Sequence, residues 1–403
     1  MGAATWALTA ASILISLTLL ELGARLFIPA PGKPAQIYMP HEKYFHTLRP
    51  GSHGAIGYYK DFGVLRFMPV RVTRQGIVDD RIHGPKIPGE FRIVVLGDSY
   101  TMGHGLRLEE TYGRVLEHEL NAAVLPKRVT VINCGVGGYA PWQEHGFMVE
   151  RGFGFEPDLV VWQLFPPNDV LGTYSKLNKL LPVFDAAWER KVLLFRKQSE
   201  LPVRIDRKAQ EISHFYASVA ALNNNEGPLF CWISDWRFAP EYDYPRLTAK
   251  YNRPWPREVC LAHWYPELEE AFEIMCGDIA SFQTECDSRG VDLIAFCHSD
   301  PISLFPKAWD KLNTNYPDTK YEMNKDLRVT QECFEKHGIM YLDVTSHLLN
   351  LDEPDRATVF YAADGHFAPA GARRVGELLA TTLLDEYFPA KFGFKHPNVV
   401  NLH

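Results

Sequence analysis

A serine lies at the junction between an apolar run and a helix-forming stretch early in the chain. Residues 91–96 read FRIVVL, which is typical of a buried strand, and Gly97-Asp98-Ser99 follows directly. A hydroxyl at such a junction lies near free backbone N–H groups and the positive end of a helix dipole, which stabilise developing negative charge. In an open α/β sheet, ligands bind at this end of the strands. Ser99 is therefore a candidate nucleophile, although Gly-Asp-Ser is also good turn chemistry.

Three further motifs carry residue types that a serine nucleophile would need. Gly138 lies in a glycine-rich turn after a second apolar run, where a backbone N–H can approach a ligand and stabilise an oxyanion. Asn168 follows a third apolar run, and its side-chain amide could donate to the same oxyanion. His366, with Asp364 close by, has the residue types of a general base oriented by a carboxylate. Taken singly, each motif is also an ordinary turn or helix cap.

Apolar runs alternate with helical stretches from residue 91 onward. The predicted strands are 92–96, 129–133, 158–164, 291–296 and 341–344, and the predicted helices are 111–123, 142–151, 266–289 and 369–387. Within 266–289 an apolar stripe at helical spacing comprises Leu268, Phe272, Met275, Ile279, Phe282 and Cys286. Gly290 stands where a C-terminal cap belongs. Buried strands separated by helices predict a parallel sheet covered on both faces.

Composition excludes several classes of protein. The chain has 403 residues, of which 46% are hydrophobic, and this is ample material for a large core. A net charge of −7, with no run rich in lysine and arginine, argues against nucleic-acid binding. The 7 cysteines form no C-x-x-C pair, so neither a zinc site nor a dense disulfide framework is indicated, and most are expected in the core.

The first 20 residues carry no charge and no proline. A helix of about 20 residues is about 30 Å long, which is enough to cross the hydrocarbon core of a bilayer. A transmembrane anchor over residues 1–28 is the leading interpretation. A cleaved signal peptide, which would normally carry a basic n-region, and a soluble or interfacial helix are the alternatives. Arg25 and Lys33 would by charge bias keep the following chain cytoplasmic.

The remaining segments frame a main domain over residues 91–390. Residues 29–90 are expected to form a linker and a small β-rich extension, and residues 391–403 a C-terminal tail. An insertion at about 172–265 is rich in aromatic residues and suits a lid, a stacking platform for a sugar or acyl chain, or a small core of its own. It holds Trp188, Trp232, Trp236, Trp255 and Trp264.

Taken together and in this order, the four motifs resemble the four blocks of the SGNH (GDSL-type) hydrolase family. The resemblance covers roughly residues 91–390 and implies a flavodoxin-like three-layer α/β/α sandwich with a central parallel sheet. Carried over by motif, Ser99 is the implied nucleophile and a first oxyanion donor through its N–H. Gly138 and Asn168 complete the implied oxyanion hole, and His366 is the implied base. The resemblance implies no metal and no organic cofactor.

The chain departs from the family pattern in two places. The third block is usually Gly-x-Asn-Asp, but Pro166 occupies the glycine position. The last block is usually Asp-x-x-His, but Ala363 stands three residues before His366 and Asp364 only two before it. Either Asp364 reaches the imidazole by a different loop path, or the protein works with a Ser-His dyad helped by a carbonyl. His104 is interpreted as a loop histidine, with a substrate-side role as the alternative.

The resemblance implies a serine esterase that acts through an acyl-enzyme. The implied substrates are short-chain esters, such as O-acetyl groups on carbohydrates, followed by lipid esters. The same site could transfer the acyl group to a sugar hydroxyl. A protein of another class, a non-catalytic envelope component that binds glycan, is the remaining hypothesis. Similar members with an N-terminal anchor are envelope proteins, so the catalytic domain is expected in the periplasm or otherwise outside the cytoplasm, against the charge bias.

Overall fold

The computed structural model describes residues 3–27, 37–41, 43–61, 64–123, 125–170, 172–173, 257–298, 301–315, 320–361 and 365–393. The chain divides into two compact units, and the second, Ile37–Leu180 with Asn252–His403, contains all the described strands. Of the predicted insertion, Trp188, Trp232, Trp236 and Trp255 lie outside the described residues.

The N-terminal segment forms one helix, α1 (Ala3–Phe27). Its last turns carry Glu21 and Arg25, while several leucine and isoleucine side chains nearer its start are exposed. Among the described residues, no helix is both long and apolar enough to cross a membrane. The transmembrane helix predicted for residues 1–28 is therefore not supported.

The second unit is built on a five-stranded sheet in which every neighbouring pair is parallel. Its strands, in spatial order, are β6 (Arg128–Gly135), β5 (Glu90–Gly97), β7 (Leu159–Leu164), β8 (Asp292–Cys297) and β9 (Met340–Leu342). Numbered along the chain this is the order 2-1-3-4-5 of flavodoxin-like folds. The predicted parallel sheet is confirmed. β9 ends earlier than predicted because Asp343 caps the next helix, α13 (Val344–Leu349), by accepting from Ser346 N.

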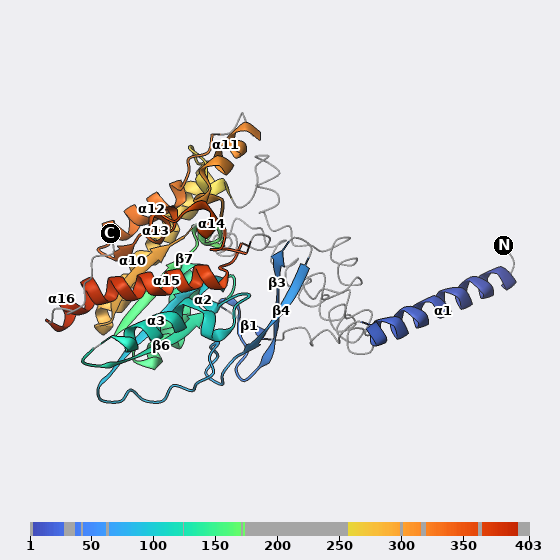
Figure 1. The fold of residues 1–403 in the computed structure, drawn as a ribbon, viewed down its shortest axis with the longest axis horizontal. Coiled ribbons are helices and arrows are strands. Elements are labelled where there is room, and N and C mark those ends of the chain that lie inside the picture. The colour runs from blue at the N-terminus through green and yellow to red at the C-terminus, as the bar shows by residue number, and fades with distance from the viewer. Residues whose placement is uncertain are drawn as a thin grey trace, which may run out of the picture. The chain divides into compact units, whose positions relative to one another are not determined.

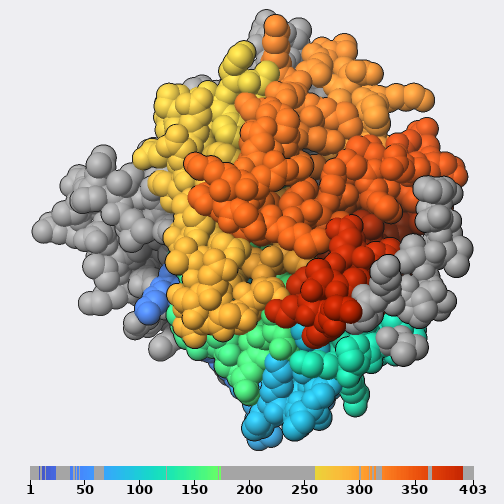
Figure 2. Space-filling view, turned by 90° about the vertical axis from the view of Figure 1, so that its left-hand side faces the viewer, coloured from blue at the N-terminus to red at the C-terminus, as the bar shows by residue number. Residues whose placement is uncertain are grey.

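Helices cover both faces of the sheet, as Figure 1 shows. On one face α3 (Tyr112–Ala122) packs beside α15 (Pro369–Thr382). The other face carries α4 (Pro141–Glu150), α10 (Pro266–Arg289) and α12 (Lys325–Lys336). Seen from the left-hand side of Figure 1, α10, α12 and the last helical residues, 383–392, meet in one closely packed surface (Figure 2). The two helical layers and the sheet make the three-layer α/β/α sandwich.

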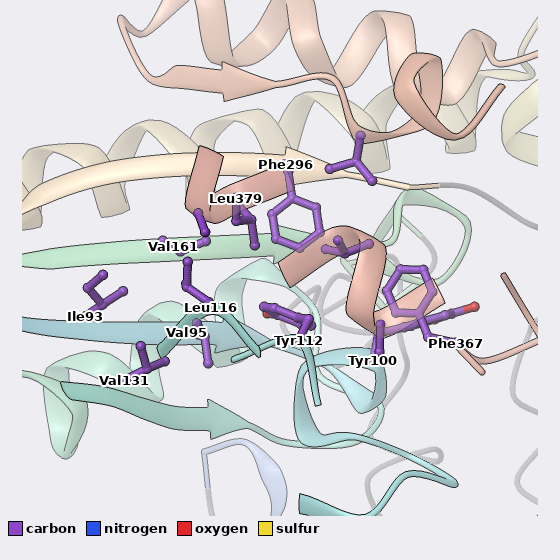
Figure 3. Packing of buried hydrophobic residues seen from close by; sticks show 14 of the residues in the cluster. Ile93, Val95, Tyr100, Tyr112, Leu116, Val131, Val161, Phe296, Phe367 and Leu379 are labelled. Carbon is purple, nitrogen blue, oxygen red and sulfur yellow. The ribbon is translucent and has the colours of Figure 1, made fainter. Parts of the chain in front are cut away.

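The core follows the two-residue period of the strands. On the α3 and α15 face, Val95 and Val161 of adjacent strands lie beneath Leu116 and Leu379 of the two helices (Figure 3). On the opposite face the Trp162 ring lies 4.8 Å from that of Phe282 and 6.4 Å from that of Phe334. Because both faces are buried, the central strands are mostly apolar rather than alternating, with a few buried polar residues such as Arg92 and Gln163.

The long helix α10 carries the predicted stripe with one correction. Its buried residues are Leu268, Ala271, Met275, Ile279, Phe282 and Cys286. Ala271, not Phe272, is buried, because Phe272 lies at the edge of the stripe, where its ring packs 5.1 Å from that of Trp264. Gly290 has a φ of +66° and caps the helix as predicted. None of the described cysteines forms a disulfide, and only Cys276 among them is not buried.

Two antiparallel hairpins precede the sheet in the chain and belong to the same compact unit. The first pairs β1 (Tyr38–His41) with β2 (Phe45–Leu48), and the second pairs β3 (His53–Asp61) with β4 (Val64–Arg71). Beyond α15 the chain continues through a π-helical turn, Leu383–Tyr387, into α16 (Phe388–Phe392). Residues 38–48 and 53–71 of the expected β-rich extension over residues 29–90 thus form two hairpins within this unit.

Candidate active site

Ser99 is the first residue of α2 (Ser99–Met102), a single helical turn that begins where β5 ends. The turn before it is tight: a Cβ on Gly97 would lie 2.2 Å from Thr101 Oγ1 and 2.4 Å from Gln163 Oε1. Only glycine fits there. Ser99 is partly exposed, whereas the residues on either side of it are buried. The strand and turn therefore present the Ser99 hydroxyl at the carboxyl edge of the sheet.

Asp98 holds this turn together. Its carboxylate accepts from the N–H of Tyr100 at 2.9 Å, as an N-cap residue does, and the side chain is 1% exposed. Burial raises the pKa of Asp98, while the hydrogen bond from Tyr100 and the charge of His366 act in the opposite direction. Asp98 was predicted only as a turn residue, although an Asp one residue before a helix is the signal of a cap.

His366 meets Ser99 from the other end of the chain. Its Nε2 atom lies 2.8 Å from Ser99 Oγ. Several hydrogen bonds fix the loop that carries it: Tyr361 N donates to the His366 carbonyl at 2.8 Å, Gly365 N to the Tyr361 carbonyl at 2.8 Å, and Tyr100 Oη to the Gly365 carbonyl at 3.0 Å. The Ser99–His366 distance is that of a nucleophile and its general base.

A second histidine lies against this pair. The His104 ring stacks on that of His366, with centroids 4.1 Å apart and planes inclined by 19°. Its backbone N–H donates to the Ser99 carbonyl at 2.9 Å. The predicted loop histidine is therefore part of the immediate surroundings of the base. Periodicity could not reveal this contact, because it depends on how two distant loops meet.

Asn168 stands after β7, the strand next to β5, so Ser99 and Asn168 flank the point where the strand order reverses. The Asn168 Nδ2 atom donates to Asp98 Oδ2 at 2.9 Å. Pro166, the departure noted above, lies in the first turn of a short helical stretch in which Asn168 N donates to the Phe165 carbonyl. Proline is well tolerated there, because the N–H it lacks would have no helical partner.

Gly138 follows β6 on the other side of β5. Its φ of +74° is in the left-handed region, and the residue is exposed. Val136 N donates to the Gly97 carbonyl at 3.0 Å and so joins this loop to the turn that carries Ser99. Within the described part of the chain, neither Ser99 N nor Gly138 N has a hydrogen-bond acceptor. Both N–H groups are thus available to a ligand at this edge.

A buried polar network supports the turn from below. Gln163 Oε1 accepts from Thr101 Oγ1 at 2.8 Å, and Thr101 Oγ1 also bonds Tyr112 Oη at 2.8 Å. On its other side the Gln163 amide lies 3.2 Å from His298 Nε2. These side chains are fully or almost fully buried, so each needs hydrogen-bond partners inside the protein.

The structure brings together Ser99, His366 and Asn168, with Gly138 on the loop joined to the same turn. Asp364 lies outside the described residues, which resume at Gly365, and its role stays a prediction. Over the described ranges, no group of three or more His, Cys, Asp or Glu side chains is arranged to hold a metal ion.

No protein-family model matches the chain, and no curated protein is similar to it. Among solved structures, a lipase/acylhydrolase from Enterococcus faecalis is similar at 13% identity and a TM-score of 0.38, over 73% of this chain and 95% of that one. A catalytic mutant of an acetylxylan esterase from Geobacillus stearothermophilus is similar at 13% identity and a TM-score of 0.38, over 78% of this chain and 99% of that one. An alpha/beta hydrolase enzyme from the metagenome of Lake Arreo, Spain, is similar at 15% identity and a TM-score of 0.39, over 72% of this chain and 94% of that one. Likeness this weak establishes neither a family nor an activity.

Proposed function

We propose that this protein is a serine-dependent carboxylic ester hydrolase. The observation that carries the proposal is the 2.8 Å contact between Ser99 Oγ and His366 Nε2 at the carboxyl edge of the sheet. Neutral imidazole at that distance can take the hydroxyl proton as the oxygen attacks. The amino end of α2 and the free N–H groups beside it favour the negative charge that such an attack creates.

The reaction would proceed in two halves. Ser99 Oγ attacks the ester carbonyl carbon while His366 Nε2 takes its proton, and the carbonyl oxygen becomes an oxyanion. The N–H groups of Ser99 and Gly138 and the second Nδ2 hydrogen of Asn168 donate to that oxyanion. Collapse expels the alcohol, which takes the proton from His366. Water then attacks the acyl carbon while His366 Nε2 takes its proton. The bond from that carbon to Ser99 Oγ breaks, Ser99 Oγ takes the proton back from His366, and the carboxylic acid leaves.

The proposed substrates are short-chain esters, with O-acetyl groups of carbohydrates first and lipid esters second. This choice rests on the resemblance of the four motifs to the SGNH hydrolases. A panel of acetylated sugars set against p-nitrophenyl esters of increasing chain length ranks the two classes. Release of acetate from the sugars at a higher kcat/KM than from the long-chain esters supports the order given, and the reverse order contradicts it.

The test of the activity itself compares the full-length protein with Ser99→Ala on p-nitrophenyl acetate. We expect the variant to lose about 10³-fold or more of kcat/KM, since a serine nucleophile has no substitute in this mechanism. Ser281→Ala, an exposed serine of α10, is the matched control and should leave the rate unchanged. Equal rates for wild type and Ser99→Ala would overturn the proposal.

A further inference from the structure

The first hairpin reaches the loop that carries Gly138. His46, in β2, lies with its Nε2 atom 2.8 Å from the carbonyl oxygen of Gly137, which is 91 residues away along the chain. A carbonyl oxygen can only accept a hydrogen bond, so the imidazole must donate. In the neutral ring, the proton therefore sits on Nε2.

The Gly137 carbonyl and the Gly138 N–H belong to one peptide unit. Because a trans peptide is planar, its C=O and N–H point to opposite sides, and a bond that fixes one fixes the direction of the other. A hydrogen bond accepted by the carbonyl also polarises the amide and strengthens its N–H as a donor. The unit is packed on its Gly137 side, where an added Cβ would lie 2.5 Å from Tyr38 Oη, whereas a Cβ on Gly138 would meet only His46 Cε1, at 4.0 Å.

The His46 ring is itself held in place. It lies edge-on to Tyr38, with centroids 5.4 Å apart, and 5.3 Å from the ring of Tyr139. Tyr139 Oη donates to the His46 carbonyl at 2.8 Å. Burial lowers the pKa of His46, which favours the neutral ring. The imidazole thus has one position and one proton with which to donate.

We propose that His46 is a positioning residue for the oxyanion hole, holding the Gly137–Gly138 peptide so that the Gly138 N–H faces the reacting carbonyl oxygen. His46 acts through this peptide and does not touch the substrate. The inference rests on the proposed esterase function, in which the Gly138 N–H is one of the donors.

The test compares two replacements of His46 with different hydrogen-bonding ability. His46→Phe keeps a flat ring and removes the donor, whereas His46→Gln keeps an N–H near the position of Nε2. An oxyanion donor acts in the transition state, so its loss lowers kcat and leaves KM. We expect His46→Phe to lose about 10- to 100-fold in kcat on p-nitrophenyl acetate with KM within about twofold, less than the loss of a whole donor. His46→Gln should stay within about threefold of wild type.

His41→Phe is the matched control, since it makes the same replacement in the same hairpin and removes the hydrogen bond that Tyr44 N donates to His41 Nδ1, without touching the Gly137 carbonyl. It should keep the wild-type kcat. Equal losses for His46→Phe and His41→Phe, or for His46→Phe and His46→Gln, would show a merely structural role and overturn the proposal. A wild-type kcat for His46→Phe would do the same.

A second measurement does not depend on the variants folding. NMR of the wild-type protein with ¹⁵N-labelled histidine identifies the tautomer of His46, and we expect the Nε2–H form. The Nδ1–H form would overturn the His46 inference alone. If wild type and Ser99→Ala hydrolyse esters equally slowly, the proposed function fails, and the catalytic role of His46 fails with it even when the Nε2–H form is found.

Discussion

Asn168 donates from Nδ2 to the Oδ2 atom of Asp98, the residue that precedes the candidate nucleophile, at 2.9 Å. The bond crosses from the loop after β7 to the turn after β5, so it fixes the amide relative to Ser99 through a single intervening residue. An amide nitrogen has two hydrogens, and this contact uses one of them. The other is free to meet an oxyanion.

Replacing Asn168 by alanine should therefore slow the chemical step. We expect kcat to fall by about 10²- to 10³-fold with KM nearly unchanged, the effect of losing one oxyanion donor. Steady-state kinetics on p-nitrophenyl acetate measure both constants. Asn350→Ala, at an exposed helix end, is the control and should match wild type. A rise in KM at constant kcat would place Asn168 in substrate binding instead.

Ser99 and His366 should behave as one unit. Because His366 Nε2 acts on the hydroxyl 2.8 Å away, removing either side chain disables the same step. We expect Ser99→Ala and His366→Ala each to lower kcat by about 10³-fold or more, and the double variant to lose no more than the worse single one. Losses that multiply in the double variant would mean that the two side chains act independently.

Asp364 is the predicted partner of His366. Asp364→Asn should lower kcat by about 10²- to 10⁴-fold, because an uncharged partner neither stabilises the imidazolium nor selects its tautomer. Asp385→Asn, an exposed residue of the C-terminal segment, serves as the control in the same kinetic assay. A variant that keeps kcat within about tenfold of wild type would favour the Ser-His dyad.

Gly97 and Gly138 should respond differently to alanine. At Gly138 the added Cβ meets only one atom at 4.0 Å, so the variant bears chiefly the strain of φ +74°, about 1–2 kcal/mol. At Gly97 the Cβ overlaps buried Thr101 and Gln163. We expect Gly97→Ala to lose about 1–3 kcal/mol more of the free energy of unfolding than Gly138→Ala does. Urea unfolding of both variants gives the two free energies. Equal losses would contradict the overlap at Gly97.

Glu144, on α4, should make stability depend on pH. Its Oε2 accepts from Trp162 Nε1 at 2.6 Å, and burial raises its pKa well above the ordinary 4.5. The folded state thus keeps the proton to a higher pH than the unfolded state, so stability is lost as the pH rises above about 4.5 towards the folded pKa. Glu144→Gln keeps an acceptor for Trp162 and removes this loss. We expect its advantage over wild type to grow by up to about 1.4 kcal/mol per pH unit in that window, measured by urea unfolding from pH 4 to 8. Parallel stability curves would contradict the raised pKa.

The sequence predicts the parts of this molecule that depend on local pattern. The parallel strands and the α10 stripe follow from apolar period, and the Gly290 cap follows from residue type. The meeting of Ser99 with His366, 267 residues apart, was predicted from motif order rather than from pattern. The stack of His104 on His366 and the reach of His46 to Gly137 were not predicted, because nothing local encodes which loops face each other. In α1, the apolar composition predicted the helix correctly, whereas the predicted membrane span is not supported among the described residues.

The contacts of the first hairpin bear on how this chain can change over evolutionary time. Tyr139 donates to the His46 carbonyl and Gln143 to that of Tyr44, so the hairpin of residues 38–48 is matched to the loop after β6 and to the start of α4. A recombination event with its crossover between those segments would join a hairpin from one parent to a foreign loop from the other. We therefore expect the two segments to be exchanged together, in a module that begins near Ile37 rather than at the first strand of the sheet.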